Sequence, residues 1–95
     1  MKVGYAIRKL RVGLNVSQRS FARSIGISQT SLSQIENGFK HPNAKTVRKV
    51  CDHICLPAEL LFLLAIDETQ VPEDKKAIYI CVQPAIMQLV MKIIR

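Results

Sequence analysis

Residues 17–38 have the sequence SQRSFARSIGISQTSLSQIENG, and this stretch decides how the chain folds. Ser17 can cap a helix, because its hydroxyl accepts a hydrogen bond from a free backbone N–H of the first turn. Three apolar residues then recur at helical spacing, namely Phe21, Ala22 and Ile25. Gly26 follows, where the left-handed conformation that ends a helix has no steric cost. The pattern predicts a short amphipathic helix and a tight turn.

A second short helix is expected after this turn. Ser28 is its cap candidate, Leu32 and Ile35 form its apolar stripe, and Asn37 followed by glycine is a strong stop. Its outward face carries uncharged side chains that are rich in hydrogen-bonding groups: Gln29, Thr30, Ser33 and Gln34. Such a face is unusual for a helix that meets only solvent.

The positive charge of the chain is concentrated in its first half. The 95 residues carry a net charge of +7 at pH 7, and the isoelectric point is near 9.7. Residues 1–50 hold ten Lys and Arg against the single acid Glu36, whereas residues 51–95 hold four bases against six acids. The basic charge therefore lies beside the helix pair, as binding of a polyanion requires.

The helix pair resembles the helix-turn-helix of the phage Cro/repressor (XRE-like) DNA-binding proteins. The resemblance is carried by Gln18, Phe21, Ala22, Gly26, Ile27, Leu32, Ser33, Ile35, Glu36 and Gly38. It extends from about residue 6 to residue 65, and it is specific because each of these positions has its own geometric role. It implies an all-α, five-helix, lambda-repressor-like domain over residues 1–66. It also implies sequence-specific binding of double-stranded DNA and regulation of transcription, most simply as a repressor.

The outward face of the second helix suits base recognition in the major groove. A helix fits that groove, glutamine bonds adenine bidentately, and Ser or Thr bonds either donor or acceptor edges. The residues expected to read bases, which the resemblance also implies, are Gln29, Thr30, Ser33 and Gln34. The residues expected at phosphates are Gln18, Ser28, Asn37, Lys40 and Lys45.

Arg11 and Glu36 are expected to form a structural ion pair. In the resembling family an arginine of the first helix pairs with the glutamate that ends the recognition helix, and Glu36 is the only acid of residues 1–50. The alternative is a solvated arginine. Breaking a partly buried pair would leave a lone charge, which costs more free energy than the pair itself contributes.

Three further helices complete the expected domain, over residues 5–13, 44–54 and 58–66. Pro57 suits the start of the last one, because its missing N–H would be unpaired there in any case. The run LLFLLAI in this helix is too apolar for a helix with one buried side. Part of it is therefore expected to face a second protomer or the chain's own tail.

Residues 67–95 form an extension outside this domain. Pro72 opens a helix and Pro84 divides the tail, although residues 78–82 could instead form a strand. The two expected helices span residues 72–82 and 84–94. The many aliphatic side chains favour a homodimer interface over folding of the tail within one chain. The expected interface residues are Leu63, Ile78, Val82, Ile86, Leu89, Val90 and Ile93.

This extension keeps a second class of function open. An antitoxin or another protein-interaction module can have the same fold while its tail binds a toxin or an antagonist protein. A controller of a restriction system is a third possibility, within the DNA-binding class. An enzyme is not expected, because the acids are scattered, His41 and His53 lack partners, and no phosphate loop or nucleophile elbow is present.

The three cysteines do not indicate a metal site, and no metal or cofactor is expected. Cys51 and Cys55 share a helix face, whereas His53 points nearly opposite. An odd number of cysteines without export features suggests reduced thiols. The chain shows no signal peptide and no run of about eighteen apolar residues, so a cytoplasmic location without a membrane span is expected.

Overall fold

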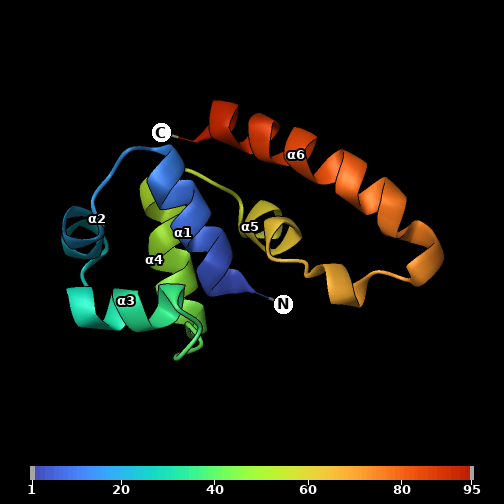
Figure 1. The fold of residues 1–95 in the computed structure, drawn as a ribbon. Coiled ribbons are helices and arrows are strands. Elements are labelled where there is room, and N and C mark those ends of the chain that lie inside the picture. The colour runs from blue at the N-terminus through green and yellow to red at the C-terminus, as the bar shows by residue number, and fades with distance from the viewer. Residues whose placement is uncertain (1, 95) are drawn as a thin grey trace.

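The computed structural model describes residues 2–94 and shows an all-α fold (Figure 1). Six α-helices and two 3-10 turns follow one another: α1 (Val3–Gly13), α2 (Gln18–Ile25), α3 (Gln29–Glu36), α4 (Ala44–Ile54), α5 (Ala58–Leu64), η1 (Glu68–Gln70), η2 (Glu73–Lys75) and α6 (Lys76–Ile93). Over this range the structure contains no strand, so the all-α class is confirmed and residues 78–82 are helical.

Three helices begin at polar side-chain caps. Ser17, Ser28 and Asn43 each accept a hydrogen bond from the backbone N–H three residues further on, at 3.1, 3.0 and 2.8 Å. The turns that end α2 and α4 are left-handed, at Gly26 (φ 76°) and Cys55 (φ 57°). These local contacts define the helix-turn-helix and the helix that follows it.

The two ends of the five-helix domain differ slightly from the expected bounds. α1 begins earlier, at Val3, and α5 ends earlier, at Leu64. The backbone N–H of Lys2 donates to the carbonyl oxygen of Ala65 at 2.7 Å, so the start of α1 is tied to the end of α5. This contact between distant parts of the chain is not readable from local sequence.

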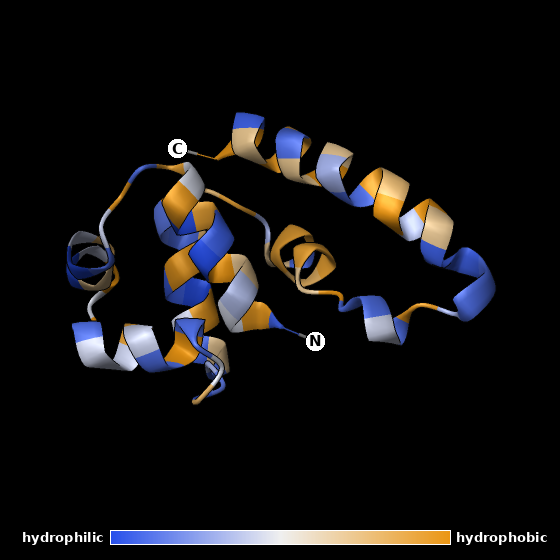
Figure 2. Cartoon of the chain, viewed as in Figure 1, coloured by the Kyte–Doolittle hydropathy of each residue, from blue (hydrophilic) through white to orange (hydrophobic). Residues whose placement is uncertain are grey.

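An aliphatic core lies between the helices. α5 is hydrophobic almost throughout (Figure 2) and inserts Leu61 and Leu64 into this core. α1 crosses α3 so closely at Gly4 that a Cβ there would collide with the carbonyl oxygen of Ile35. The nearly inaccessible large side chains are Phe21, Ile7, Leu10, Leu32, Ile54, Leu61, Val50 and Val90.

The prediction of two helices in the tail is wrong. Residues Lys76–Ile93 form one helix, α6, with Pro84 inside it. Proline removes the hydrogen bond to the carbonyl four residues earlier, here that of Ile80. Ile80 lies at the surface, where water can replace such a lost bond, and the helix continues through Pro84.

One side of α6 packs on the chain's own domain. Val90 and Ile94 belong to the core, and the side chain of Met91 lies against Gly13 of α1. The hydroxyl of Tyr79 donates to the carbonyl oxygen of Ile66 at 2.7 Å. On this side the tail folds within one chain, which was the alternative to an interface.

One of the expected interface residues is therefore corrected. Val90 is 0% exposed, whereas Ile86 is only partly buried against the same core. A partner cannot contact Val90 in this fold, because the intramolecular packing of α6 has already removed it from solvent. The other five expected residues are exposed: Leu63, Ile78, Val82, Leu89 and Ile93.

The stretch Glu73–Ile93 is long and apolar enough to cross a membrane, by length and composition alone. Core helices of soluble proteins satisfy the same criteria. This stretch contains Pro84 and Lys92, and its last turns pack on the core through Val90. We therefore describe it as a surface helix of the folded domain.

Candidate nucleic-acid interface

α3 turns a polar surface outward while its apolar side anchors it. Leu32 and Ile35 are buried in the core. The outward side chains and Gln18 of α2 together line one open hollow of about 290 Å³, whose residues are Gln18, Gln29, Thr30, Ser33 and Gln34. The structure thus brings the four residues expected to read bases onto one surface, next to one residue expected at a phosphate.

A buried ion pair holds α3 against the rest of the helix-turn-helix. Glu36 is 4% exposed, and the Arg11 guanidinium donates to both of its oxygens, at 2.8 Å from Nε and 3.0 Å from Nη2. Arg11 also donates to the carbonyl oxygen of Val16 at 2.8 Å. Such a bidentate pair is geometrically specific. It joins α1, the turn before α2 and the end of α3 at one point.

Gln18 adds a third contact to this pair. Its Nε2 donates to Oε1 of Glu36 at 3.0 Å. A glutamine amide has two N–H groups, so one remains for another acceptor such as a phosphate. No buried side-chain nitrogen or oxygen among residues 2–94 lacks a hydrogen-bond partner, and the network around Glu36 is therefore complete.

The other residues expected at phosphates are exposed and lie at helix ends. Ser28 caps α3, and Asn37 follows its last residue, with Nδ2 at 3.4 Å from Ser33 Oγ. Lys40 lies in the next loop, where its Nζ donates to Ser31 Oγ at 3.2 Å. Lys45 is in the first turn of α4, where free backbone N–H groups attract anions.

The surface around α3 is cationic. Glu36 is the only acid of residues 1–50, and it is buried against Arg11. The exposed surface of this half therefore presents Lys and Arg without a carboxylate of its own. A polyanion such as duplex DNA is attracted by such a surface, and the attraction weakens as salt increases.

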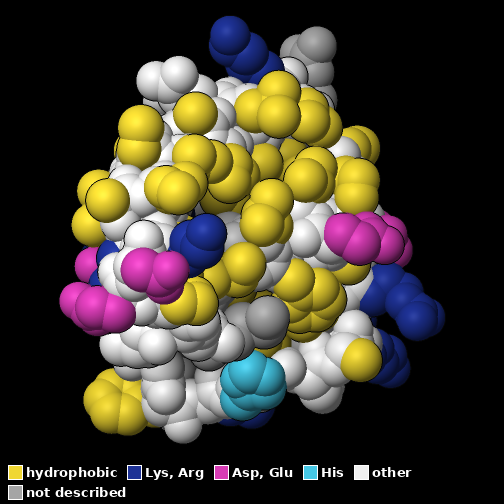
Figure 3. All heavy atoms as spheres, turned by 90° about the vertical axis from the view of Figure 1, so that its right-hand side faces the viewer, with side chains coloured by type: hydrophobic (Ala, Val, Ile, Leu, Met, Phe, Trp, Pro, Cys, Tyr) yellow, Lys and Arg dark blue, Asp and Glu magenta, His cyan; other side chains and the backbone are white. Residues whose placement is uncertain are grey.

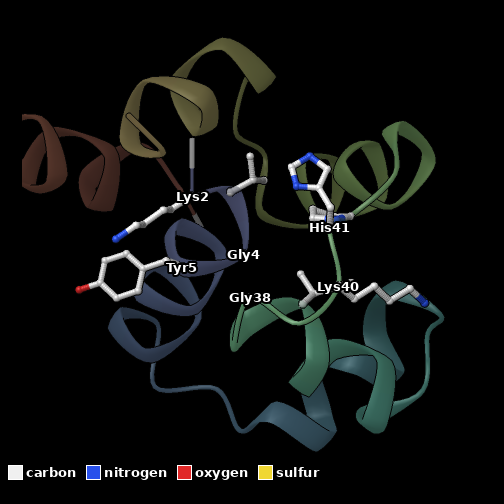
Figure 4. A pocket seen from close by; sticks show the side chains of 9 residues that line it. Lys2, Gly4, Tyr5, Gly38, Lys40 and His41 are labelled. Carbon is white, nitrogen blue, oxygen red and sulfur yellow. The ribbon is translucent and has the colours of Figure 1, made fainter. Parts of the chain in front are cut away.

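A second hollow, of about 210 Å³, lies where the start of α1 meets the loop after α3. Figure 4 shows that the side chains of Lys2, Lys40 and His41 point away from one another. Small-molecule sites instead have a few polar groups that converge on the ligand. This hollow lacks that arrangement.

The cysteines and His53 have structural surroundings. Within residues 2–94, no group of three or more His, Cys, Asp or Glu could hold a metal ion. Cys51 is buried, and this burial raises the pKa of its thiol. The ring of His53 packs edge-on against Phe21, with 5.7 Å between the centroids.

A second exposed surface is apolar. We call the exposed side chains Ile78, Val82, Leu89 and Ile93 the outer face of α6. Apolar side chains spread over much of the upper part of the molecule when it is seen from the side on which α6 begins (Figure 3). Leu63 and Phe62 of α5 are also exposed.

Sequence reasoning assigned no role to one exposed residue beside α3. Phe39 is 84% exposed in the loop that follows α3. A lone aromatic between Gly38 and Lys40, in a stretch of polar residues, was the available signal.

Comparison with known proteins agrees with this geometry. The family model for helix-turn-helix proteins matches residues 7–60. An uncharacterized HTH-type transcriptional regulator of Mycobacterium tuberculosis is 34% identical over 62 residues, which are 65% of this chain and 44% of that protein. The ImmF control region 10 kDa protein of Bacillus phage phi105 is 36% identical over 73 residues, which are 77% of this chain and 78% of that protein.

A solved structure has a similar fold. The crystal structure of the clp gene regulator ClgR from Corynebacterium glutamicum matches with a TM-score of 0.62, over 93% of this chain and 82% of that chain. The sequences are 22% identical, so this likeness concerns the fold alone. The chain spans 44% of the length of the mycobacterial relative, whereas it spans 78% of the phage protein. With more than half of its residues matched, the chain belongs to the Cro/C1-type (XRE) helix-turn-helix family of DNA-binding transcriptional regulators, which is not a family of enzymes.

Proposed function

We propose that this protein is a repressor that binds a palindromic operator as a homodimer, with α3 in the major groove. The observation that carries the proposal is the pairing of two features. An open hollow of uncharged hydrogen-bonding side chains lies on α3, and residues 1–50, to which it belongs, carry ten Lys and Arg and no exposed carboxylate. The first feature suits base edges and the second suits phosphates.

The polar residues of this surface divide into two sets in the proposal. The base-reading residues are Gln29, Thr30, Ser33 and Gln34. The phosphate-contacting residues are Gln18, Ser28, Asn37, Lys40 and Lys45. The network of Arg11, Glu36 and Gln18 sets the angle of α3 relative to α2, since it connects the two helices through short, directed bonds.

The proposed dimer uses mainly residues 67–95, while residues 1–66 bind DNA. Its interface is the outer face of α6 together with Leu63, because these apolar side chains are exposed in the single chain. A second copy would remove them from water, and a twofold axis would set the two recognition helices about one DNA turn, ~34 Å, apart. The name of the phage relative, a control region protein, is compatible with repression. The protein would act in the cytoplasm, where this family meets DNA.

Selection of bound sequences from a random duplex pool at near-physiological salt tests the proposal. We expect enrichment of a palindrome whose half-sites lie about one turn, ~34 Å, apart. Salt-sensitive binding without enrichment would mean phosphate contact without base reading, and it would reject the proposed operator recognition. Placing the selected operator within a reporter promoter then tests repression, which predicts lower transcription when the protein is present.

Two variants separate base reading from phosphate contact. Gln34→Ala should weaken operator binding by roughly 1–3 kcal/mol and relax specificity at one base step. Lys45→Ala should weaken binding to all duplexes alike and lower the slope of log K against log salt by about one. An unchanged sequence profile for Gln34→Ala, or a sequence-dependent loss for Lys45→Ala, would contradict these assignments.

A second candidate function follows from the outer face of α6. The same apolar surface could bind a toxin or an antagonist protein in place of a second copy. Light scattering on the purified chain distinguishes the two: a dimer that Leu89→Ser dissociates supports the homodimer, with Gln88→Ser as the neighbouring polar control. A monomer at all accessible concentrations supports the heterologous partner.

A further inference from the structure

Phe39 is the most exposed of the large hydrophobic side chains identified in residues 2–94. It is 84% exposed, whereas the next, Ile78, is 60% exposed. An aromatic ring gains free energy when a contact removes it from water, and this gain is among the largest for any side chain. A single exposed hydrophobic residue needs no explanation by itself, so its place in the fold decides what it can contact.

The loop that carries Phe39 is tied to the end of α3. The backbone N–H groups of Phe39 and Lys40 both donate to the carbonyl oxygen of Gln34, at 2.9 and 3.1 Å. Gly38 before them is left-handed, with φ 82°. Lys40 Nζ also reaches Ser31 of α3, at 3.2 Å. The backbone of this loop is therefore fixed relative to the helix that carries the polar hollow, and the ring projects from it into solvent.

The surroundings of Phe39 are polar and cationic rather than apolar. Its exposed neighbours in the chain are Asn37, Lys40 and His41. The loop after α3 and helix α6 lie on opposite sides of the molecule (Figure 1). Phe39 is therefore not part of the apolar surface proposed for a second copy. An exposed aromatic residue that precedes a lysine in the chain, in a half whose single carboxylate is buried, suits a surface that alternates negative and apolar groups.

We infer that Phe39 contacts duplex DNA at the edge of the major groove, with its ring against a deoxyribose of the backbone. The inference rests on the proposed placement of α3 in that groove. The DNA backbone alternates phosphates with sugars, and proteins contact both for positioning. Asn37 and Lys40 are proposed at phosphates, so the residue between them in the same loop faces the intervening sugar. The ring adds apolar contact area where its neighbours add charge and hydrogen bonds.

Phe39→Ala tests this contact on the selected operator. We expect the Kd to rise about five- to tenfold, since part of the burial free energy of an aromatic side chain is lost. The slope of log K against log salt should stay unchanged, because no cation is removed. Phe39→Leu should raise the Kd less, about two- to threefold, because leucine retains part of the apolar area.

Two controls accompany this measurement. Lys40→Ala should weaken binding and lower the salt slope by about one, which distinguishes a phosphate contact from the apolar one. Val12→Ala truncates an exposed apolar side chain on α1 and should leave the Kd unchanged. Light scattering on Phe39→Ala should show the wild-type oligomeric state.

Three results would overturn the inference. Wild-type affinity of Phe39→Ala would show that the ring makes no DNA contact. A loss confined to thymine-containing operators, and absent when deoxyuridine replaces thymidine, would place the ring on a base methyl group instead of a sugar. A changed oligomeric state would assign Phe39 to a protein interface. Failure of the proposed function would look different, since Gln34→Ala and Lys45→Ala would then also bind like wild type.

Discussion

The outward side of α3 and the outer face of α6 are both exposed helix surfaces, yet their chemistry is opposite. The first carries glutamine, serine and threonine, and the second carries isoleucine, valine and leucine. The two helices lie on opposite sides of the molecule (Figure 1). When a polar, uncharged surface binds a partner, its hydrogen bonds to water are replaced by hydrogen bonds to that partner. An apolar surface is instead stabilised because burial removes it from water. One chain thus presents two exposed surfaces of opposite chemistry.

The two helices are also held in different ways. α3 is held by a buried, bidentate ion pair between Arg11 and Glu36, besides its apolar stripe. α6 is held by aliphatic packing of its last turns, around Val90, and by the hydroxyl of Tyr79. Removing one member of a directed polar network lowers the stability of the fold strongly, because a buried charge is left without its partner. Truncating an aliphatic side chain lowers the stability in proportion to the buried atoms that are removed. This difference can be measured.

The largest effect is expected when the ion pair of α3 is broken. Arg11→Met leaves the Glu36 carboxylate buried with Gln18 as its remaining side-chain donor, so the free energy of unfolding should fall by about 3–5 kcal/mol. Urea unfolding followed by circular dichroism measures this loss. The double variant Arg11→Met/Glu36→Leu should recover most of it, because no uncompensated charge is left. A loss below about 1 kcal/mol, the range of an exposed pair, would mean that water already reaches Glu36.

Adjacent residues of α6 should respond differently to truncation. Val90→Ala removes buried atoms from the core and should lower the free energy of unfolding by about 2 kcal/mol. Leu89→Ala removes exposed atoms and should change monomer stability by less than about 0.5 kcal/mol, while it weakens self-association. Unfolding at low protein concentration and sedimentation at several concentrations separate the two effects. Equal stability losses for both variants would contradict the inward packing of α6.

A substitution at Cys55 should change the stability of the fold without altering the outward side of α3 or the outer face of α6. It is left-handed (φ 57°), a conformation that costs a residue with a Cβ roughly 1–2 kcal/mol and costs glycine nothing. Cys55→Gly should therefore raise the free energy of unfolding by about 1 kcal/mol, part of the gain being offset by the greater freedom of the unfolded chain. Thermal unfolding measures it, and operator affinity should stay as in wild type. A lower melting temperature would show that the Cys55 side chain makes a contact that outweighs its strain.

The smallest effect is a pH dependence at the connection to α6. The N–H of Thr69 donates to Asp67 at 3.2 Å and, with the nearby Lys2, lowers the pKa of this carboxyl below its ordinary value. A lowered pKa means that the ionised form favours the fold. Its contribution is present above the unfolded-state pKa and is lost as pH falls through the folded-state pKa, so it disappears in acid.

Melting temperatures of wild type and Asp67→Asn between pH 2 and pH 6 measure this dependence. Wild type should lose more stability than the variant on acidification through this range. Identical pH profiles would show that the carboxyl contributes nothing. DNA binding at neutral pH should be the same for both proteins, because Asp67 lies outside the surface around α3.

Much of the DNA-binding half could be predicted because its structure is encoded locally. Ser17, Ser28 and Asn43 cap the helices that follow them, and Gly26 ends α2. Local hydrogen bonds between neighbours in the chain need only residue type and spacing. The polar residues of α3 share a surface for the same reason, since helical periodicity sets their direction.

The C-terminal half could be predicted less well because α6 lacks a clear polar face. Val90 and Leu89 are both aliphatic, and residue type alone does not tell which of them is buried. Pro84 was interpreted as a break, but an exposed helix tolerates the lost hydrogen bond where water replaces it. The role of Phe39 was missed because its loop has no periodicity from which a direction could be inferred.

By itself, the sequence determined the helix-turn-helix, its caps and turns, the uncharged polar face of α3 and the cationic balance of the first half. These features follow from residue types at fixed short spacings. Only the tertiary structure decided that Gln18 completes the network around Glu36 and that α6 is one helix packed on the core through Val90. It also decided that the backbone of Phe39 is bonded to Gln34 while its side chain is largely exposed to water. Each of these depends on segments that meet across the fold, or on which of several similar side chains the core has room to bury.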